Sequence, residues 1–187
     1  MDRATFLKYV GAAPMALWLT ACGRSESRPY TRPATPADSS KAYHTLPDFE
    51  PLDKPAAAWR GMVSDEAHYI LFGEGTESRY SSPLLEEKRD GTFICAACYL
   101  PLFSSASKYE SGTGWPSFWT PVAERYLGTK RDTKLAMPRT EYHCARCGGH
   151  QGHIFKDGPE PTGLRYCNNG LALNFIPAGE SLPALRS

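Results

Sequence analysis

Cys167 carries the clearest chemical signal in this sequence, because it stands between Arg165 and Asn169. Residues 165–169 are expected to form a short strand, and alternation along a strand would point these three side chains the same way. The guanidinium would favour the thiolate, which is the nucleophilic form, and the amide could donate to a negative charge that develops nearby. The alternative is that Cys167 is a small buried hydrophobic residue, as free cysteines often are.

Four other cysteines form two CxxC pairs, a pattern typical of metal sites. Cys95 pairs with Cys98 and Cys144 with Cys147, and residues 99–143 lie between the pairs. Four thiolates supply the closed tetrahedral set that structural Zn²⁺ prefers, with no open position for a substrate. Disulfides are the alternative in an oxidising compartment, but two CxxC units favour zinc. We therefore predict one structural Zn²⁺ per chain.

The elements that must position these residues are short strands rather than long helices. The chain has 187 residues with 16 Gly, 16 Pro and 12% aromatic residues, which favours a mainly β class. One helix is predicted, with Ser64 as its N-cap, an acidic first turn and Gly73 at its end. Strand patterns dominate from Gly91 onward, and the predicted strands cover 92–94, 141–143, 152–155, 165–169 and 171–176.

Three ranges are predicted from composition and hydrophobicity along the chain. Residues 1–21 have a charged start and an apolar run too short to span a bilayer, which indicates an export signal; an ordinary N-terminal helix is the alternative. Residues 22–42 are rich in Ser, Pro, Arg and Thr and indicate a flexible linker. Residues 43–187 would form the folded domain.

The overall composition limits the classes of partner. The net charge is +1 and the charges are mixed along the chain, so no basic face for nucleic acid is expected. A hydrophobic content of 41% suits one compact domain. We expect this domain to be a monomer that does not bind nucleic acid.

The segment Leu19-Thr20-Ala21-Cys22 resembles the lipobox of bacterial lipoproteins. This resemblance implies that Cys22 is acylated, becomes the new N-terminus and anchors the protein to a membrane. It further implies an exported protein of the periplasm or cell envelope. The start of the chain also resembles a twin-arginine signal, although it contains only Arg3.

Three further motifs stand along the chain: SGTGWPSF at 111–118, GHIFKDGP at 152–159 and RYCNN at 165–169. They resemble motifs of the type B methionine sulfoxide reductases, and the resemblance extends roughly over 43–177. It implies a β-tent fold of two antiparallel sheets with a short N-terminal helix and a structural zinc. It also implies reduction of methionine-R-sulfoxide in oxidised proteins or peptides, with a thioredoxin-like thiol as reductant.

The same resemblance implies roles for individual residues. Cys167 would be the nucleophile, and His153, Asn169 and His150 would surround the sulfoxide oxygen, while Arg165 would help to hold the thiolate. Attack on a sulfoxide needs a proton at the oxygen, and histidine titrates near neutral pH. The alternative for both histidines is that they satisfy local hydrogen bonds.

Two aromatic residues would line the pocket for the substrate methyl group, namely Trp115 and Phe155. Packing in the core is the alternative for Trp115. His150 and His153 would point to opposite faces of a regular strand, so their convergence is predicted to require a bend at the glycines 148, 149 and 152.

Four positions depart from the common pattern of the family. Thr113 stands where many members carry a resolving cysteine, Tyr99 replaces a usual glycine, Gln151 a usual apolar residue and Gly170 a usual serine. Without the resolving cysteine, a sulfenic acid on Cys167 would have to be reduced by an external thiol.

Two other functions compete with the reductase. The first is a zinc-ribbon-like binding module in which Cys167 is merely buried. The second is a thiol-disulfide oxidoreductase that uses one CxxC pair as its redox couple. Zinc bound at all four cysteines would exclude the second function, because those thiolates would not be available for exchange.

Overall fold

The computed structural model describes residues 46–135 and 137–187. The predicted signal at 1–21, the lipid-bearing Cys22, the linker at 22–42 and the domain start at Tyr43 lie outside these residues. Within the described ranges, none of the helices has the length and apolar character needed to cross a bilayer.

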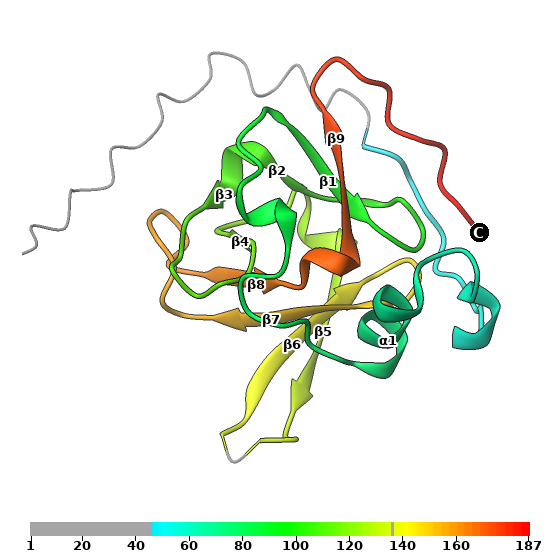
Figure 1. The fold of residues 1–187 in the computed structure, drawn as a ribbon, viewed down its shortest axis with the longest axis horizontal. Coiled ribbons are helices and arrows are strands. Elements are labelled where there is room, and N and C mark those ends of the chain that lie inside the picture. Colours follow the sequence, from blue (N-terminus) through cyan, green and yellow to red (C-terminus); the bar gives the residue numbers. More distant parts are fainter. Residues whose placement is uncertain (1–45, 136) are drawn as a thin grey trace, which may run out of the picture. The chain divides into compact units, whose positions relative to one another are not determined.

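Two antiparallel β-sheets make up the described domain (Figure 1). The small sheet has the order β2-β1-β9 and the large sheet the order β3-β4-β8-β7-β6-β5. This architecture confirms the mainly β prediction. The strands are β1 Gly91–Cys95, β2 Pro101–Ser104, β3 Lys108–Tyr109, β4 Ser117–Phe118, β5 Leu127–Asp132, β6 Arg139–Cys144, β7 His150–Phe155, β8 Arg165–Asn168 and β9 Leu173–Pro177.

The single α-helix of the described residues, α1, spans Asp65–Gly73, as its capping pattern predicts. The Ser64 hydroxyl accepts a hydrogen bond from the Ala67 amide at 3.1 Å. The left-handed residue after the helix is Glu74, with φ 53°, rather than the predicted glycine. Short 3-10 helices connect the strands: η2 Ala56–Trp59, η3 Pro83–Leu85, η4 Ser105–Ser107, η5 Glu124–Tyr126 and η6 Gly170–Ala172.

The last strand begins later than the predicted 171–176, because η6 precedes it. The Glu77 carboxylate accepts hydrogen bonds from the amides of Gly170 at 2.6 Å and Leu171 at 3.0 Å. These amides are therefore used by a side chain and are not free to join a strand ladder. The alternation of apolar residues cannot reveal this competition.

Aromatic side chains from both sheets form the core. Phe103 of β2 stacks on Phe118 of β4 with ring centroids 4.3 Å apart, and Tyr166 of β8 lies 5.8 Å from Phe103. Burial of one such side chain contributes about 1.5–3 kcal/mol. Because Tyr166 points into this core, alternation along β8 directs its neighbours Arg165 and Cys167 to the opposite face of the large sheet.

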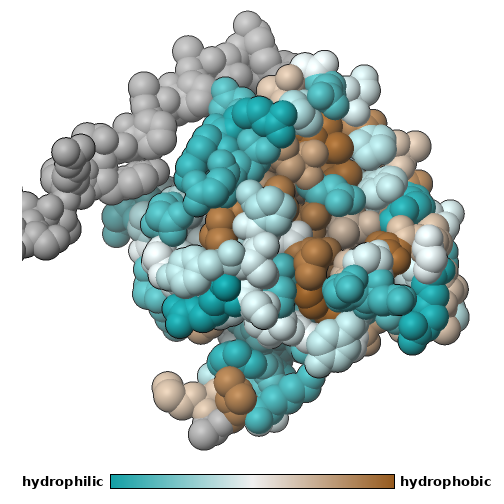
Figure 2. Space-filling model, viewed as in Figure 1, coloured by the Kyte–Doolittle hydropathy of each residue, from teal (hydrophilic) through white to brown (hydrophobic). Residues whose placement is uncertain are grey.

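Strands β5 and β6 form a hairpin that extends past the neighbouring strands (Figure 1). Its tip exposes Leu135 at 58% and Met137 at 78%, and the hydrophobic colour gathered there is visible in Figure 2. The strands of the hairpin also contribute two carboxylates, Asp132 and Glu141, which the candidate site uses.

Candidate functional site

A row of directly paired residues crosses the large sheet through Cys167. Residues opposite each other on neighbouring antiparallel strands project from the same face. All members of the row therefore share the face that Cys167 occupies. In order across the sheet they are Tyr109, Ser117, Cys167, His153, Glu141 and Lys130.

Cys167 lies partly buried on this face, and two opposing influences act on its thiol. Burial raises the pKa of Cys167 above the ordinary value, whereas the charge of Arg165 and a hydrogen bond from the Thr113 hydroxyl lower it. Arg165 thus acts in the predicted direction, but burial outweighs it. The thiol form is favoured in the free protein.

Arg165 is held in place on both sides. Its guanidinium donates two hydrogen bonds of 2.8 Å to Asp157 and lies 4.3 Å from the ring centroid of Phe155. A bidentate pair of this kind fixes the orientation of the guanidinium. The structure therefore brings Arg165 and Cys167 to one face, as the strand pattern predicts, and it pairs Phe155 with Arg165 on that face.

His150 and His153 lie on the same face, with ring centroids 5.5 Å apart. Tyr142 pairs with Gly152, whereas the next residue, His143, pairs with His150. One extra residue, Gln151, therefore lies in β7 as a β-bulge, and it shifts the alternation by one position. The two histidines therefore share a face because of this bulge, which lies directly beside Gly152, one of the glycines at which a bend is predicted.

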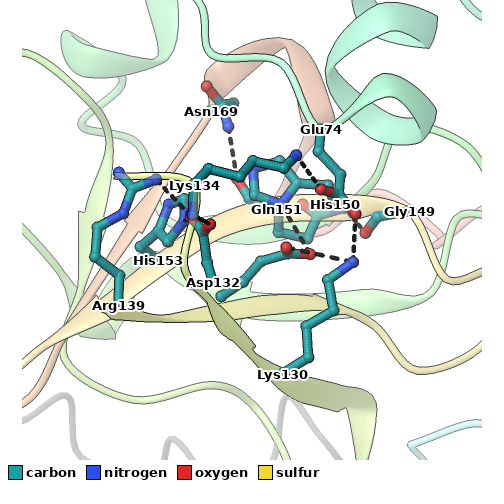
Figure 3. A network of polar contacts seen from close by, with 11 residues as sticks. Glu74, Lys130, Asp132, Lys134, Arg139, Gly149, His150, Gln151, His153 and Asn169 are labelled. Atoms are coloured by element: carbon teal, nitrogen blue, oxygen red, sulfur yellow. Dashed lines mark hydrogen bonds and ion pairs between the residues drawn. The ribbon is translucent and has the colours of Figure 1, made fainter. Parts of the chain in front are cut away.

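Each histidine faces a carboxylate from the hairpin, and Figure 3 shows His153 beside Asp132. His153 Nε2 lies 2.7 Å from Asp132 Oδ2, and His150 Nδ1 lies 3.1 Å from Glu141 Oε1. Burial lowers the pKa of both imidazoles, and the two carboxylates oppose that shift. The neutral imidazole is favoured at both positions. Sequence reasoning missed both carboxylates, because only the strand register places them beside the histidines.

An outer layer of charges connects the hairpin to the end of α1. Lys130 and Lys134 both pair with Glu74 (Figure 3). Lys130 Nζ also lies 3.4 Å from Glu141 Oε2. The two lysines lower the pKa of Glu74 to about 2. Glu74, which follows α1, thereby contacts the hairpin β5–β6, whose strands carry Asp132 and Glu141.

Asn169 follows the end of β8 rather than continuing the predicted strand. Its side-chain oxygen accepts from the Glu77 amide at 3.1 Å, and its nitrogen donates to the Gln151 carbonyl at 3.0 Å. The side chain is buried. These contacts fix the loop that follows Cys167 to the bulge that carries the histidines.

Trp115 is half-buried on the loop before β4, and its indole Nε1 donates to the Glu77 carbonyl at 3.2 Å. The side-chain carboxylate of Glu77 accepts a hydrogen bond from the Gly170 amide. A Cβ atom at Gly170 would lie 1.8 Å from Ser82 Oγ, so the serine that is usual at this position would collide with Ser82. The departure at Gly170 therefore has a local steric cause.

The predicted metal ligands Cys95, Cys98, Cys144 and Cys147 come together in one buried cluster. Their Sγ atoms all lie within 4.8 Å of one another, and the printed contacts are 3.6 Å for Cys95 with Cys147 and 3.5 Å for Cys98 with Cys144. A zinc–sulfur bond of about 2.3 Å corresponds to tetrahedral edges of roughly 3.8 Å. Disulfide sulfurs would lie about 2.05 Å apart. The donor set and spacing fit a structural Zn²⁺, and all four thiols are free.

Two of the departures from the family pattern lie beside this cluster. Gln151 is fully buried and its side-chain nitrogen lies 3.6 Å from Cys95 Sγ, while its oxygen accepts from Asn168 at 3.4 Å. Tyr99 adopts a left-handed φ of 66°, and the Arg186 guanidinium lies 4.3 Å from its ring centroid. An amide thus connects the cysteine cluster to β8, and the C-terminal segment covers the first CxxC turn.

A cleft of about 420 Å³ lies elsewhere, between the start of α1, η3 and β9. It is lined by Met62, Leu171, Phe175 and other residues, but not by Cys167, His153 or Trp115. The chemistry therefore belongs to the row on the large sheet and not to this cleft.

Comparison with known proteins identifies relatives of the described domain. Residues 63–177 match the SelR domain family. A peptide methionine sulfoxide reductase MsrB of Pseudomonas putida is 45% identical over 129 residues, which are 69% of this chain and 97% of the relative. The MsrB of Leptospira interrogans is 46% identical over 124 residues, covering 66% and 95%. The MsrB of Caulobacter vibrioides is 50% identical over 122 residues, covering 65% and 76%.

Proposed function

We infer that this chain, which belongs to the SelR domain family, is a peptide-methionine (R)-S-oxide reductase whose nucleophile is Cys167. It reduces methionine-R-sulfoxide to methionine. The observation that carries the assignment of the nucleophile is the direct pairing of Cys167 with His153 across β8 and β7. A binding module would have no use for a thiol and a carboxylate-bound imidazole in adjacent positions of one face.

The proposed reaction starts from a neutral pair, because burial raises the pKa of Cys167 and lowers that of His153. The substrate sulfur would lie against Cys167 Sγ and its oxygen toward His153. As the Cys167 sulfur attacks the sulfoxide sulfur, the thiol proton passes to the oxygen through His153, with His150 beside it. The oxygen then moves to Cys167, so that thiol and sulfoxide become sulfenic acid and thioether with no net proton change.

The other residues of the face would bind and orient the substrate. Trp115 and Phe155 would contact the methyl group, and Asn169 would hold the loop beside the oxygen. Arg165, fixed by Asp157, would stabilise negative charge on the Cys167 sulfur during attack. Zinc bound at the four-cysteine cluster would tie the two CxxC turns together and stabilise the fold.

Regeneration would use an external thiol. Thr113 is placed beside Cys167 as a hydroxyl donor and offers no sulfur. A thiol of a thioredoxin-like protein would attack the sulfenic acid, release water and form a mixed disulfide, which a second thiol would resolve. The clustered cysteines argue against the alternative of a redox-active CxxC pair.

We also propose that the protein is exported and held on a membrane of the cell envelope by lipid on Cys22, and that it acts as a monomer. The support is the segment Leu19-Thr20-Ala21-Cys22 and the polar linker that follows it. Mass spectrometry of the natively produced protein should find residues 1–21 absent and lipid on Cys22. An intact N-terminus would refute the anchor without affecting the reductase assignment.

The decisive experiment is an assay of the purified protein on separated R and S epimers of a methionine sulfoxide peptide, with a dithiol as reductant. The R epimer should be reduced and the S epimer left unchanged. Cys167→Ser should abolish turnover while elemental analysis still finds zinc. Full activity of Cys167→Ser would refute the assigned nucleophile, and reduction of neither epimer would refute the function.

A further inference from the structure

Arg79 and Tyr80 form an exposed rim beside the loop that carries Thr113 and Trp115. Arg79 Nε donates to the Thr113 carbonyl at 3.0 Å, and the Arg79 guanidinium carbon lies 5.4 Å from the ring centroid of Trp115. The side chain of Thr113 lies beside Cys167 and lowers the pKa of its thiol. One residue therefore separates the Arg79 side chain from the reactive thiol.

The charge of Arg79 has no counterpart among the described residues. The neighbouring cation of the site, Arg165, is engaged by Asp157 in a bidentate pair, whereas Arg79 forms no ion pair within the ranges that the structure describes. Its Nε is occupied by Thr113, which leaves the other guanidinium nitrogens available for a ligand. The guanidinium is thus a fixed, exposed positive charge at the edge of the site.

The backbone of the rim is held in an unusual conformation. Tyr80 has a φ of 61°, which costs a non-glycine residue about 1 kcal/mol or more. Its amide donates to the Gly114 carbonyl at 2.8 Å and its hydroxyl donates to the Gly112 carbonyl at 3.1 Å. These two bonds keep the exposed Tyr80 ring and the Arg79 side chain against the loop 111–115 before any ligand arrives.

We propose that Arg79 and Tyr80 form a subsite for the side-chain carboxylate of an Asp or Glu next to the methionine sulfoxide in the substrate polypeptide. The proposal rests on the reductase function inferred above. Arg79 donates to the carboxylate, and the Tyr80 ring packs against the aliphatic part of that residue. A surface ion pair contributes about 0.2–1 kcal/mol, which corresponds to a preference of up to about fivefold.

The test compares peptides blocked at both ends that contain methionine-R-sulfoxide. Matched pairs carry Asp or Asn, on either side of the sulfoxide, so that only the charge differs. For the unmodified protein, kcat/KM should be about two- to fivefold higher for an Asp peptide, mainly through KM, and the preference should shrink as salt increases. Arg79→Gln should remove the preference, and Arg79→Lys should keep part of it.

The matched control is Arg131→Gln, which removes an exposed charge from β5. Arg131 follows Lys130, so strand alternation directs its side chain to the face opposite to Cys167. It should retain the full preference. Equal kcat/KM for all Asp and Asn peptides, or a preference that persists in Arg79→Gln, would refute the subsite. Loss of R-sulfoxide reduction for every peptide with the unmodified protein would instead refute the reductase function.

Discussion

At the scale of single residues, burial shifts the pKa values of the two proposed reacting groups in opposite directions. It raises the pKa of the Cys167 thiol and lowers that of the His153 imidazole, so both are uncharged near neutral pH. An uncharged pair is stable in a partly buried site without a counter-ion. It also leaves the thiol proton available for the sulfoxide oxygen.

The pH dependence of Cys167 alkylation should therefore have a midpoint above the ordinary thiol pKa of about 8.5. Arg165→Gln should move the midpoint higher still, because the arginine charge lowers the pKa of Cys167. The rate of iodoacetamide labelling of Cys167, followed by mass spectrometry of its peptide, measures both midpoints. A midpoint below the ordinary value in the unmodified protein would contradict the thiol form.

Asp132 should act on the reaction through His153. Asp132→Asn removes a hydrogen bond that raises the pKa of His153, so the NMR titration of that imidazole should shift to lower pH. The reductase step should slow by about tenfold or more, since acid catalysis needs the oriented ring. Glu141→Gln is the matched control for the titration of His153, because its carboxylate faces His150. An unchanged titration of His153 in Asp132→Asn would exclude this role.

The four clustered cysteines could be predicted from their spacing, and the position of Cys167 on one face with Arg165 could be predicted from the strand pattern. Asp132 and Glu141 could not be found this way. Glu141 is separated from His150 by one turn, and Asp132 is separated from His153 by strand β6 and two turns. The sequence pattern does not specify the pairing registers that bring them together. Hydrogen bonds between strands depend on that register, since a shift of one residue reverses the face of every side chain.

At the scale of elements, the hairpin β5–β6 positions the histidines from outside, and α1 holds the hairpin. Glu74 pairs with Lys130 and Lys134, and Lys130 approaches Glu141. The helix and most strands could be predicted from capping and alternation. The bulge at Gln151 and the 3-10 helix before β9 could not, because each depends on contacts with distant residues.

Glu74→Gln should lower the free energy of unfolding at pH 7 by about 1 kcal/mol, since these ion pairs are partly exposed and screened. The folded-state pKa of Glu74, about 2, lies below its ordinary value of 4.5. Its contribution is therefore present above pH 4.5 and is lost as the pH falls toward 2. Urea unfolding of both proteins across this range should show the difference disappearing in acid. A constant difference at every pH would contradict the ion pairs.

At the scale of the whole molecule, the two CxxC turns come from distant parts of the chain and meet in one cluster. Cys95 belongs to the small sheet and Cys144 to the large sheet, so a metal at the cluster would join the two sheets directly. The spacing of the pairs predicts the ligands. It does not predict that the buried Gln151 bridges the cluster to β8, which only the folded chain reveals.

Regeneration depends on which thiols this architecture leaves accessible to Cys167. Among the described residues, the other four cysteines are buried in the cluster, and Thr113 occupies the position beside the nucleophile. Without reductant, one equivalent of methionine should form per enzyme, and a sulfenate-specific reagent should label Cys167 while zinc remains bound. Addition of thioredoxin should then restore turnover. Thiolates held by a closed tetrahedral zinc cannot attack a sulfenic acid while they remain ligands. An internal disulfide between Cys167 and a clustered cysteine, accompanied by release of zinc, would therefore contradict this prediction and make a cysteine of the metal site the resolving thiol.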